Sequence, residues 1–223
     1  MKAAFVHDTF YSQTPDGEVY VFGAFPSSLW QERFLPHFTS LTIIGRERPF
    51  EASHASRAIR SDTPGVGFML LPNISSIAGL AMRGEVASQI RKTVGQADAV
   101  IVRGPSEFGM IAVNEANRAA RIVKLTSVNK PVAIEMSGCA FDHTWHYGSL
   151  AGKLYAPVKY LRARKMVNSA DAVIYVTEKF LQRRYPARGT VANASNVEIE
   201  TPSSDVLENR LKRIDGNTPS PSA

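Results

Sequence analysis

The sequence contains a single cysteine, Cys139, among its 223 residues. One thiol excludes a disulfide within the chain and is typical of a reducing cytosol. No group of Cys and His residues has the spacing of a structural zinc site, so we expect no metal. No apolar run approaches the ~18–20 residues that span a bilayer. The first residues lack the apolar core and cleavage site of a signal peptide and predict a strand, so we expect a cytoplasmic protein.

The glycine-rich motifs of nucleotide-binding folds are also missing. A dinucleotide fold needs Gly-x-Gly-x-x-Gly after its first strand, and the corresponding turn here contains only Gly17. Neither a Gly-x-x-x-x-Gly-Lys-Ser/Thr loop nor a Gly-x-Ser-x-Gly elbow occurs. The sequence therefore argues against a nicotinamide or flavin dehydrogenase, which would need a cofactor, and against an α/β-hydrolase.

Short apolar segments alternate with longer segments of helical periodicity along most of the chain. This alternation predicts an α/β fold, a Rossmann-like three-layer sandwich with a mostly parallel sheet of about seven strands. The predicted strands are 2–7, 41–44, 66–71, 97–102, 131–136, 172–176 and 190–192, and the predicted helices are 18–34, 77–94, 107–123, 152–169 and 178–186. We interpret 7–17, 46–64 and 137–149 as loops.

The composition changes near residue 201. We therefore predict one domain over 1–200, followed over 201–223 by a linker helix at 206–214 and a disordered tail.

The net charge of +6 is concentrated between residues 159 and 188. This segment holds eight basic and two acidic residues: Lys159, Arg162, Arg164, Lys165, Lys179, Arg183, Arg184 and Arg188 against Asp171 and Glu178. Solvated helix faces would account for the charge, and so would a surface for anionic lipid or a pyrophosphate-linked substrate. No interleaving of aromatic and basic residues accompanies it, so we expect no nucleic-acid partner.

Ligands collect at the carboxyl ends of strands in an open α/β sheet, which directs attention to four loops. Asp16 and Gly17 precede the first predicted helix, whose free N–H groups suit an anion, although an ordinary turn fits equally well. Arg103 and Ser106 follow the fourth strand, where the guanidinium could hold a phosphate or form a surface ion pair. Thr177 follows the sixth strand and predicts a helix N-cap beside a ligand.

The loop from Glu135 to Gly148 has the highest concentration of side chains that could bind a ligand or transfer a proton. Asp142, His143, Trp145, His146 and Tyr147 fall within six residues, next to Gly138. Aromatic rings stack on sugars, whereas Asp and His bind hydroxyls or transfer protons. A packed loop with satisfied histidines is the alternative. Glu107 and Glu115 mimic a Glu-x7-Glu pair, which we interpret as a solvated helix face.

Two stretches resemble bacterial glycosyltransferases of family 4, especially those that build capsular and exopolysaccharide repeat units. The first is WHYGSLAGKLYAP over residues 145–157. The second is ADAVIYVTEKFLQRRYP over residues 170–186, and it is followed by Ser-Asn-Val at 195–197. The sequence departs from the family in having one glycine after the first strand, and Gly138-Cys139 where many relatives have Gly-Asp.

The resemblance implies one half of a GT-B fold, the N-terminal domain that holds the acceptor. In this family a C-terminal domain carries the Glu-x7-Glu motif and binds the nucleotide-sugar, and the enzymes are metal-independent and retain anomeric configuration. We expect that donor domain to be absent from this chain, and a retaining hexosyltransferase that is inactive without it.

The implied substrates are a nucleotide-sugar and a lipid-linked oligosaccharide. The resemblance also implies that the protein is peripheral to the inner face of the plasma membrane, where it would contact anionic lipid. On this hypothesis Asp142, His143 and His146 are catalytic or position the acceptor hydroxyl. The expected substrate-binding residues are Asp16, Gly17, Arg103, Ser106, Glu135, Gly138, Trp145 and Thr177, with Gly17 bordering the donor pyrophosphate. The alternative is a non-catalytic Rossmann-like module that recruits a lipid carrier or partner subunit.

Overall fold

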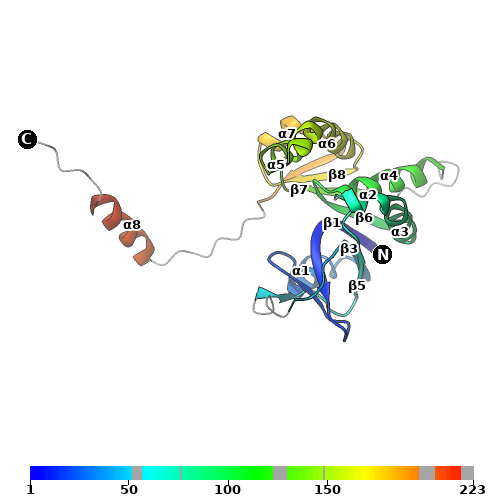
Figure 1. Ribbon diagram of the computed structural model, residues 1–223, viewed down its shortest axis with the longest axis horizontal. Helices are drawn as coiled ribbons and strands as arrows, with labels where there is room; N and C mark the ends of the chain where they lie inside the picture. The colour runs from blue at the N-terminus through cyan, green and yellow to red at the C-terminus, as the bar shows by residue number, and fades with distance from the viewer. Residues whose placement is uncertain (52–56, 76, 123–129, 148, 196–203, 217–223) are drawn as a thin grey trace, which may run out of the picture.

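The computed structural model describes residues 1–51, 57–75, 77–122, 130–147, 149–195 and 204–216 (Figure 1). Within these ranges, seven parallel strands form the centre of the sheet in the order β5–β3–β1–β6–β7–β8–β9. Their bounds are β1 Lys2–Gln13, β3 Ser40–Glu47, β5 Val66–Leu71, β6 Ala99–Gly104, β7 Val132–Met136, β8 Ala172–Tyr175 and β9 Thr190–Asn193. The prediction of a mostly parallel α/β sheet is confirmed.

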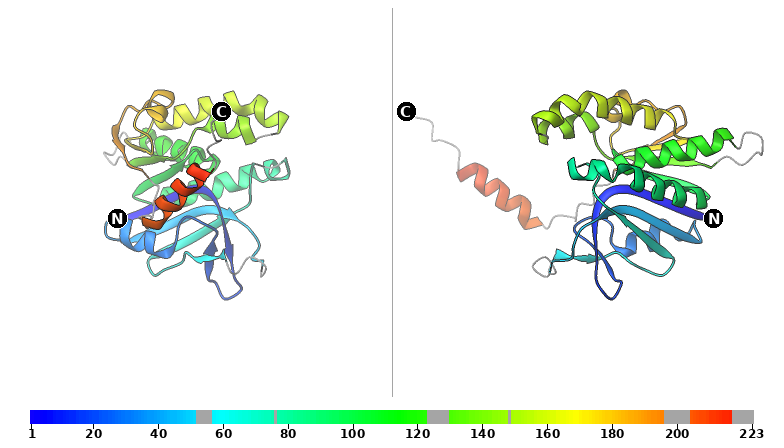
Figure 2. Two further views of the ribbon diagram at one scale, coloured as in Figure 1. Left: turned by 90° about the vertical axis from the view of Figure 1, so that its left-hand side faces the viewer. Right: turned by 45° about the vertical axis from the view of Figure 1, so that its right-hand side comes forward.

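Side chains of β1 alternate between two apolar cores, one on each face of the sheet. Ala4 and Val6 belong to the larger core, which holds the buried faces of α3 (Arg83–Gln96), α4 (Glu107–Ile122) and α6 (Leu150–Asn168). Ala3 and Phe5 belong to the smaller core, where α1 (Ser27–Arg33) contributes Trp30. This alternation is the period of two expected of a strand buried on both faces, and it gives the three layers seen in Figure 2.

The remaining helices are short or lie near the chain's end. They are α2 Ile77–Ala81, α5 Ala140–Tyr147, α7 Phe180–Arg184 and α8 Ser204–Gly216. Residues 205–214 of α8 are exposed, and Figure 1 shows this helix apart from the sheet. Of the tail predicted to be disordered over 215–223, Asp215 and Gly216 belong to α8, so the prediction is wrong for them, and 217–223 lie outside the described residues. Across the described ranges, no helix has both the length and the apolar character to cross a membrane.

The prediction of a helix over 18–34 is wrong for its first half. β1 continues through Gln13 and pairs antiparallel with β2 (Val19–Val21), which in turn pairs with β4 (Ile59–Arg60). Val19 and Val21 are both buried, a strand period that competes with the helical one. Gly23 and Phe25 then adopt positive φ, which no helix tolerates, so α1 begins only after Pro26.

The predicted loop at 137–149 is largely helical. Helix α5 occupies Ala140–Tyr147, and Ser149 then caps α6 by accepting a 3.2 Å hydrogen bond from the Gly152 N–H. Gly148 lies outside the described residues. The predicted helix at 77–94 is divided into α2 and α3. The predicted loop at 7–17 forms the second half of β1 and the turn that leads to β2, and the predicted loop at 46–64 contains the end of β3 and all of β4.

Candidate functional site

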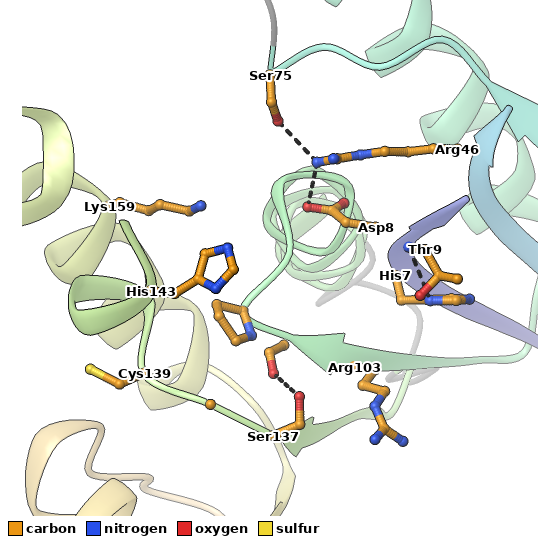
Figure 3. Close-up of a pocket in the computed structure, with 13 residues that line it drawn as sticks. His7, Asp8, Thr9, Arg46, Ser75, Arg103, Ser137, Cys139, His143 and Lys159 are labelled. Carbon is orange, nitrogen blue, oxygen red and sulfur yellow. Dashed lines mark hydrogen bonds and ion pairs between the residues drawn. The ribbon is translucent and has the colours of Figure 1, made fainter. Parts of the chain in front are cut away.

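A pocket of about 530 Å³ lies beside the irregular middle of β1 at His7–Thr9, at the carboxyl ends of β3 and β6, and beside the turn after β7 (Figure 3). Helices α5 and α6 provide its other wall through His143 and Lys159. The full lining is His7, Asp8, Thr9, Arg46, Ser75, Arg103, Gly104, Pro105, Ser137, Gly138, Cys139, His143 and Lys159. This edge of an open parallel sheet is where α/β proteins bind ligands, so we refer to this cavity as the edge pocket.

Asp8 occupies the N-terminus of α4 with its own carboxylate. It accepts hydrogen bonds from the backbone N–H groups of Glu107 (2.8 Å) and Phe108 (3.2 Å) and from the Ser106 hydroxyl (2.8 Å). The β1–β3 register shifts between Val6 and Phe10, and Asp8 lies within that irregular stretch. The positive end of the helix is therefore already neutralised by the protein itself.

Three cationic side chains line the pocket, so its positive charge exceeds the single negative charge of Asp8. Arg46 donates to Asp8 (2.8 Å) and to the Ser75 hydroxyl (2.9 Å), and its Nε is buried without a hydrogen-bond partner among the described residues. Lys159 reaches in from α6, and Arg103 stands at the end of β6 (Figure 3). The pocket thus suits an anionic ligand such as a phosphate or pyrophosphate.

His7 is buried at the base of the pocket and uncharged. Its Nδ1 accepts from the Thr9 backbone N–H (3.3 Å), so its Nε2 carries the proton and donates to the Tyr11 hydroxyl (2.8 Å). Burial, and secondarily the charges of Arg103 and Arg46, lower the pKa of His7 to about 3. A neutral imidazole here can serve as a fixed hydrogen-bonding group and does not supply a positive charge.

Arg103 belongs to a charge cluster at the rim of the edge pocket. Glu135 accepts from Arg33 at 2.7 Å and lies 3.4 Å from Arg103, whose guanidinium also stacks over the Phe25 ring at 5.1 Å. Phe25 holds an unusual φ of 80°, and its carbonyl accepts from the Ser61 hydroxyl. Arg103 also lines two further cavities: a small one with Glu135 and Ser137, and one of about 480 Å³ with Arg33, Phe25 and Ser195.

Helix α5 separates the three residues predicted to be catalytic. His143 lines the edge pocket, whereas Asp142 accepts a 2.9 Å ion pair from Arg184, which also approaches the Cys139 Sγ. His146 is exposed near the helix end. Trp145 is 43% exposed and stacks on Phe141. His143 is therefore the member of the predicted group that the fold brings to the pocket.

The other predicted binding residues divide into two groups. Arg103 and Gly138 line the edge pocket, and Glu135 lies beside it. Ser106 is buried and caps α4 through the Gly109 N–H (2.8 Å). Thr177 accepts from the Leu181 N–H (3.0 Å), but the N-cap position of α7 is Lys179, so the prediction of Thr177 as N-cap is wrong.

Asp16 and Gly17 form the exposed tip of the β1–β2 hairpin, with Gly17 at φ 87°. No helix follows them, because β2 does. The predicted anion site at a helix N-terminus is therefore wrong here, and the positive φ shows that the glycine is required by the turn.

The prediction of a solvated face for Glu107 and Glu115 is wrong at Glu107. This carboxylate is buried and lies between Arg83 (3.3 Å) and Arg162 (3.0 Å). Glu115, two turns further along α4, forms an ion pair with Arg91. Within the basic segment 159–188, Arg162 therefore pairs with the buried Glu107, and Arg184 pairs with the part-exposed Asp142.

Sequence reasoning did not name His7, Asp8 or Arg46 as binding residues, and it counted Lys159 only as part of the basic segment 159–188. A usable signal existed for the first three, since His7 ends the first predicted strand, Asp8 follows it and Arg46 lies two residues after the second. The rule that ligands meet the carboxyl ends of strands applies to them as it does to Arg103. Nothing in the helical pattern of 152–169 marked Lys159.

The fold and the edge pocket define an α/β protein with a pocket lined by cationic side chains at one edge of its sheet. No family model matches the chain. Protein CapJ of Staphylococcus aureus is 29% identical over 218 residues, a match that covers 95% of this chain and shows that the two are homologous. It covers 52% of CapJ, so the chain spans about half the length of this curated relative.

A solved structure of an alpha-glucosyltransferase, in complex with UDP and a 13-mer DNA containing a HMU base, also resembles the chain. The match covers 95% of this chain and 45% of that one, at 14% identity and a TM-score of 0.43. At this level the likeness adds nothing to the fold assignment, which rests on the sheet itself.

Proposed function

We propose that this chain is the acceptor-binding half of a GT-B glycosyltransferase. The intact enzyme would transfer a hexose, with retention, from a nucleotide-sugar to a lipid-linked oligosaccharide in capsule or exopolysaccharide biosynthesis. The supporting observation is the edge pocket, which Arg46, Arg103 and Lys159 line at one edge of a parallel sheet. The homology to CapJ and the sequence resemblance to family 4 are consistent with this role.

In this proposal the pocket's cations bind the phosphates that link the acceptor's sugar to its lipid. Arg46 is already oriented by Asp8 and Ser75, so it would lose little side-chain freedom on binding. A pyrophosphate carries enough charge to offset the excess positive charge of the three cations.

The sugar end of the acceptor would lie toward α5. His143 would hydrogen-bond the acceptor hydroxyl, and the backbone at Gly138 would lie close to the ligand. Asp142 and His146, the other two residues proposed for catalysis, would act from the same helix, with Asp142 held by Arg184. Trp145, exposed beside them, would stack on a more distant sugar.

The donor nucleotide-sugar would be bound by a second domain outside this chain. The match to about half of CapJ agrees with such a division. We further propose that the enzyme works at the inner face of the plasma membrane, where its lipid-borne acceptor lies and where anionic lipid attracts basic residues.

A binding experiment tests the pocket assignment. A short-chain polyprenyl diphosphate sugar would be titrated into the full chain by calorimetry. We expect Arg46→Gln and Lys159→Gln each to weaken binding by about 10- to 100-fold, since a hydrogen bond to a charged group contributes roughly 1.5–3 kcal/mol. Arg60→Gln is the matched control, because Arg60 pairs with Glu18 and Asp62 away from the pocket.

A transfer assay tests the activity. The chain would be incubated with the lipid-linked acceptor and a panel of nucleotide-sugars, with and without the remaining half of CapJ as a donor domain. Turnover only in the combined reaction supports the proposal. Acceptor binding without turnover in either reaction would favour a non-catalytic binding module, and equal acceptor binding by all three variants would refute the pocket assignment.

A further inference from the structure

Helix α6 is apolar on two opposite sides. Its inner side contributes Ala156, Ala163, Met166 and Val167 to the core. On its outer side Leu150, Leu154, Val158 and Leu161 are 77%, 76%, 47% and 61% exposed. Their spacings of four, four and three residues place them in one line along the helix. We call these four residues the outer stripe.

A helix that is apolar on its solvent side needs an explanation, because surface helices normally present polar residues there. Single exposed leucines are common on protein surfaces, whereas a continuous line of four is the pattern of an interaction site. Trp145, on the adjoining α5, adds an exposed aromatic ring close to the start of α6, since Thr144 contacts Gly152.

The charged residues of the helix that carries the outer stripe are all of one sign. Helix α6 contains five basic residues and no acidic residue. Arg162 is held by Glu107 and Lys159 lines the edge pocket. Lys153, Arg164 and Lys165 remain exposed beside the stripe. An apolar line flanked by Lys and Arg is the arrangement of helices that lie in the interface of an anionic membrane.

We propose that the outer stripe docks on an anionic lipid bilayer, with its leucines among the acyl chains and Lys153, Arg164 and Lys165 on headgroup phosphates. A second copy of this chain is a poor occupant, because pairing two stripes would bring like charges together. This inference rests on the proposed function, which brings the protein to a lipid-borne acceptor. It goes further in assigning the contact to one helix, whose Lys159 reaches the edge pocket (Figure 3).

The test is co-sedimentation of the full chain with phosphatidylcholine vesicles, with and without about 30 mol % phosphatidylglycerol, at about 0.1 M salt. We expect binding to the anionic vesicles. The triple variant Leu150→Ser/Leu154→Ser/Leu161→Ser should bind at least roughly tenfold more weakly, because three apolar side chains no longer insert. The three leucines are exposed in the folded chain, so circular dichroism of the triple variant should show an unchanged fold.

The matched control is Leu207→Ser/Leu211→Ser on α8, which removes two exposed leucines from another helix. It should bind like the unaltered chain. Vesicles containing brominated lipid should quench Trp145, while Trp30, which is fully buried, should keep its emission. A Trp145→Phe variant identifies the quenched signal.

Three results would overturn the inference: no binding to anionic vesicles, equal binding by the triple variant, or loss of binding in the α8 variant alone. The acceptor titration uses a soluble short-chain ligand and no membrane. Failure of vesicle binding with normal acceptor binding would therefore refute the docking surface and leave the proposed function standing. Loss of acceptor binding with normal vesicle binding would refute the proposed function and leave the docking surface standing.

Discussion

The carboxylate of Asp8 lies 2.8 Å from the guanidinium of Arg46 and at the same time receives the first free N–H groups of α4. One side chain therefore links three elements, β1, β3 and α4, at the edge where the pocket opens. Because the helix terminus is already occupied by Asp8, a ligand in the pocket would meet Arg46, Arg103 and Lys159 and not the helix dipole.

Replacing Asp8 should destabilise the fold through both of its roles. Asp8→Ala removes the acceptor at the α4 N-terminus and leaves Arg46 largely buried without its partner, and we expect a loss of about 3 kcal/mol in the free energy of unfolding. Asp8→Asn keeps one acceptor oxygen and should cost about half as much. Urea denaturation measures both, and an unchanged midpoint in Asp8→Ala would contradict this account.

The buried His7 should make stability depend on pH. In the unfolded chain His7 titrates near 6.5, whereas in the folded protein its pKa is about 3. Below about pH 6.5 the unfolded state therefore binds a proton that the native state does not, and stability falls as the pH falls from about 6.5 to about 3. The slope approaches about 1.4 kcal/mol per pH unit.

The His7→Gln variant should lack this contribution. The comparison is best made between about pH 7 and pH 5, above the range in which most carboxylates titrate. We expect the free energy of unfolding of the unaltered chain to decline more steeply than that of the variant over this interval. Parallel slopes would show that His7 is protonated in the native state.

Gly189 lies against the backbone that leads into β8. A Cβ at this position would stand 2.1 Å from the Asp171 carbonyl oxygen, so Gly189→Ala should cost more than about 2 kcal/mol. Gly95→Ala is the control, because a Cβ there meets nothing within 4 Å. In the exposed last turn of α3 it should stabilise by about 0.5–1 kcal/mol. Thermal unfolding should shift the two midpoints in opposite directions.

Tyr185 supports the helix that carries His143. Its buried hydroxyl accepts from the Ala140 N–H at 2.8 Å, at the start of α5, and burial raises its pKa. Tyr185→Phe leaves that N–H without a partner, which should cost about 1–3 kcal/mol. Faster hydrogen exchange at Ala140 should accompany the loss. Unchanged exchange there would mean that the hydroxyl does not hold the helix.

The parallel sheet was predictable because its strands are short apolar runs separated by helices of ordinary length. Residues 97–102 and 172–176 illustrate this, each following the end of a periodic segment. The hairpin after β1 was not predictable in the same way, because Val19, Phe22 and Phe25 fit a helical spacing while Val19 and Val21 fit a strand. Positive φ at Gly23 and Phe25 decides between them, and only the folded chain shows it.

The candidate site was predictable at Arg103, Gly138 and His143, because Arg103 lies at the carboxyl end of β6 and the other two follow the carboxyl end of β7. Residue type alone could not separate His143 from its neighbours Asp142 and His146, because the prediction treated 137–149 as a loop and not as a helix with distinct faces. Lys159 reaches the pocket from the middle of α6. That contact depends on how the helix packs, which local sequence does not encode.

Arg103 lines the edge pocket and both neighbouring cavities, and it shares Glu135 with Arg33. The three spaces therefore share one charged side chain. A ligand in one cavity that draws Arg103 away from Glu135 changes the charge that faces the others, and thermodynamic linkage requires that the effect be reciprocal by the same factor. A ligand that moved this guanidinium in one cavity would therefore be expected to change the affinity for a ligand in another.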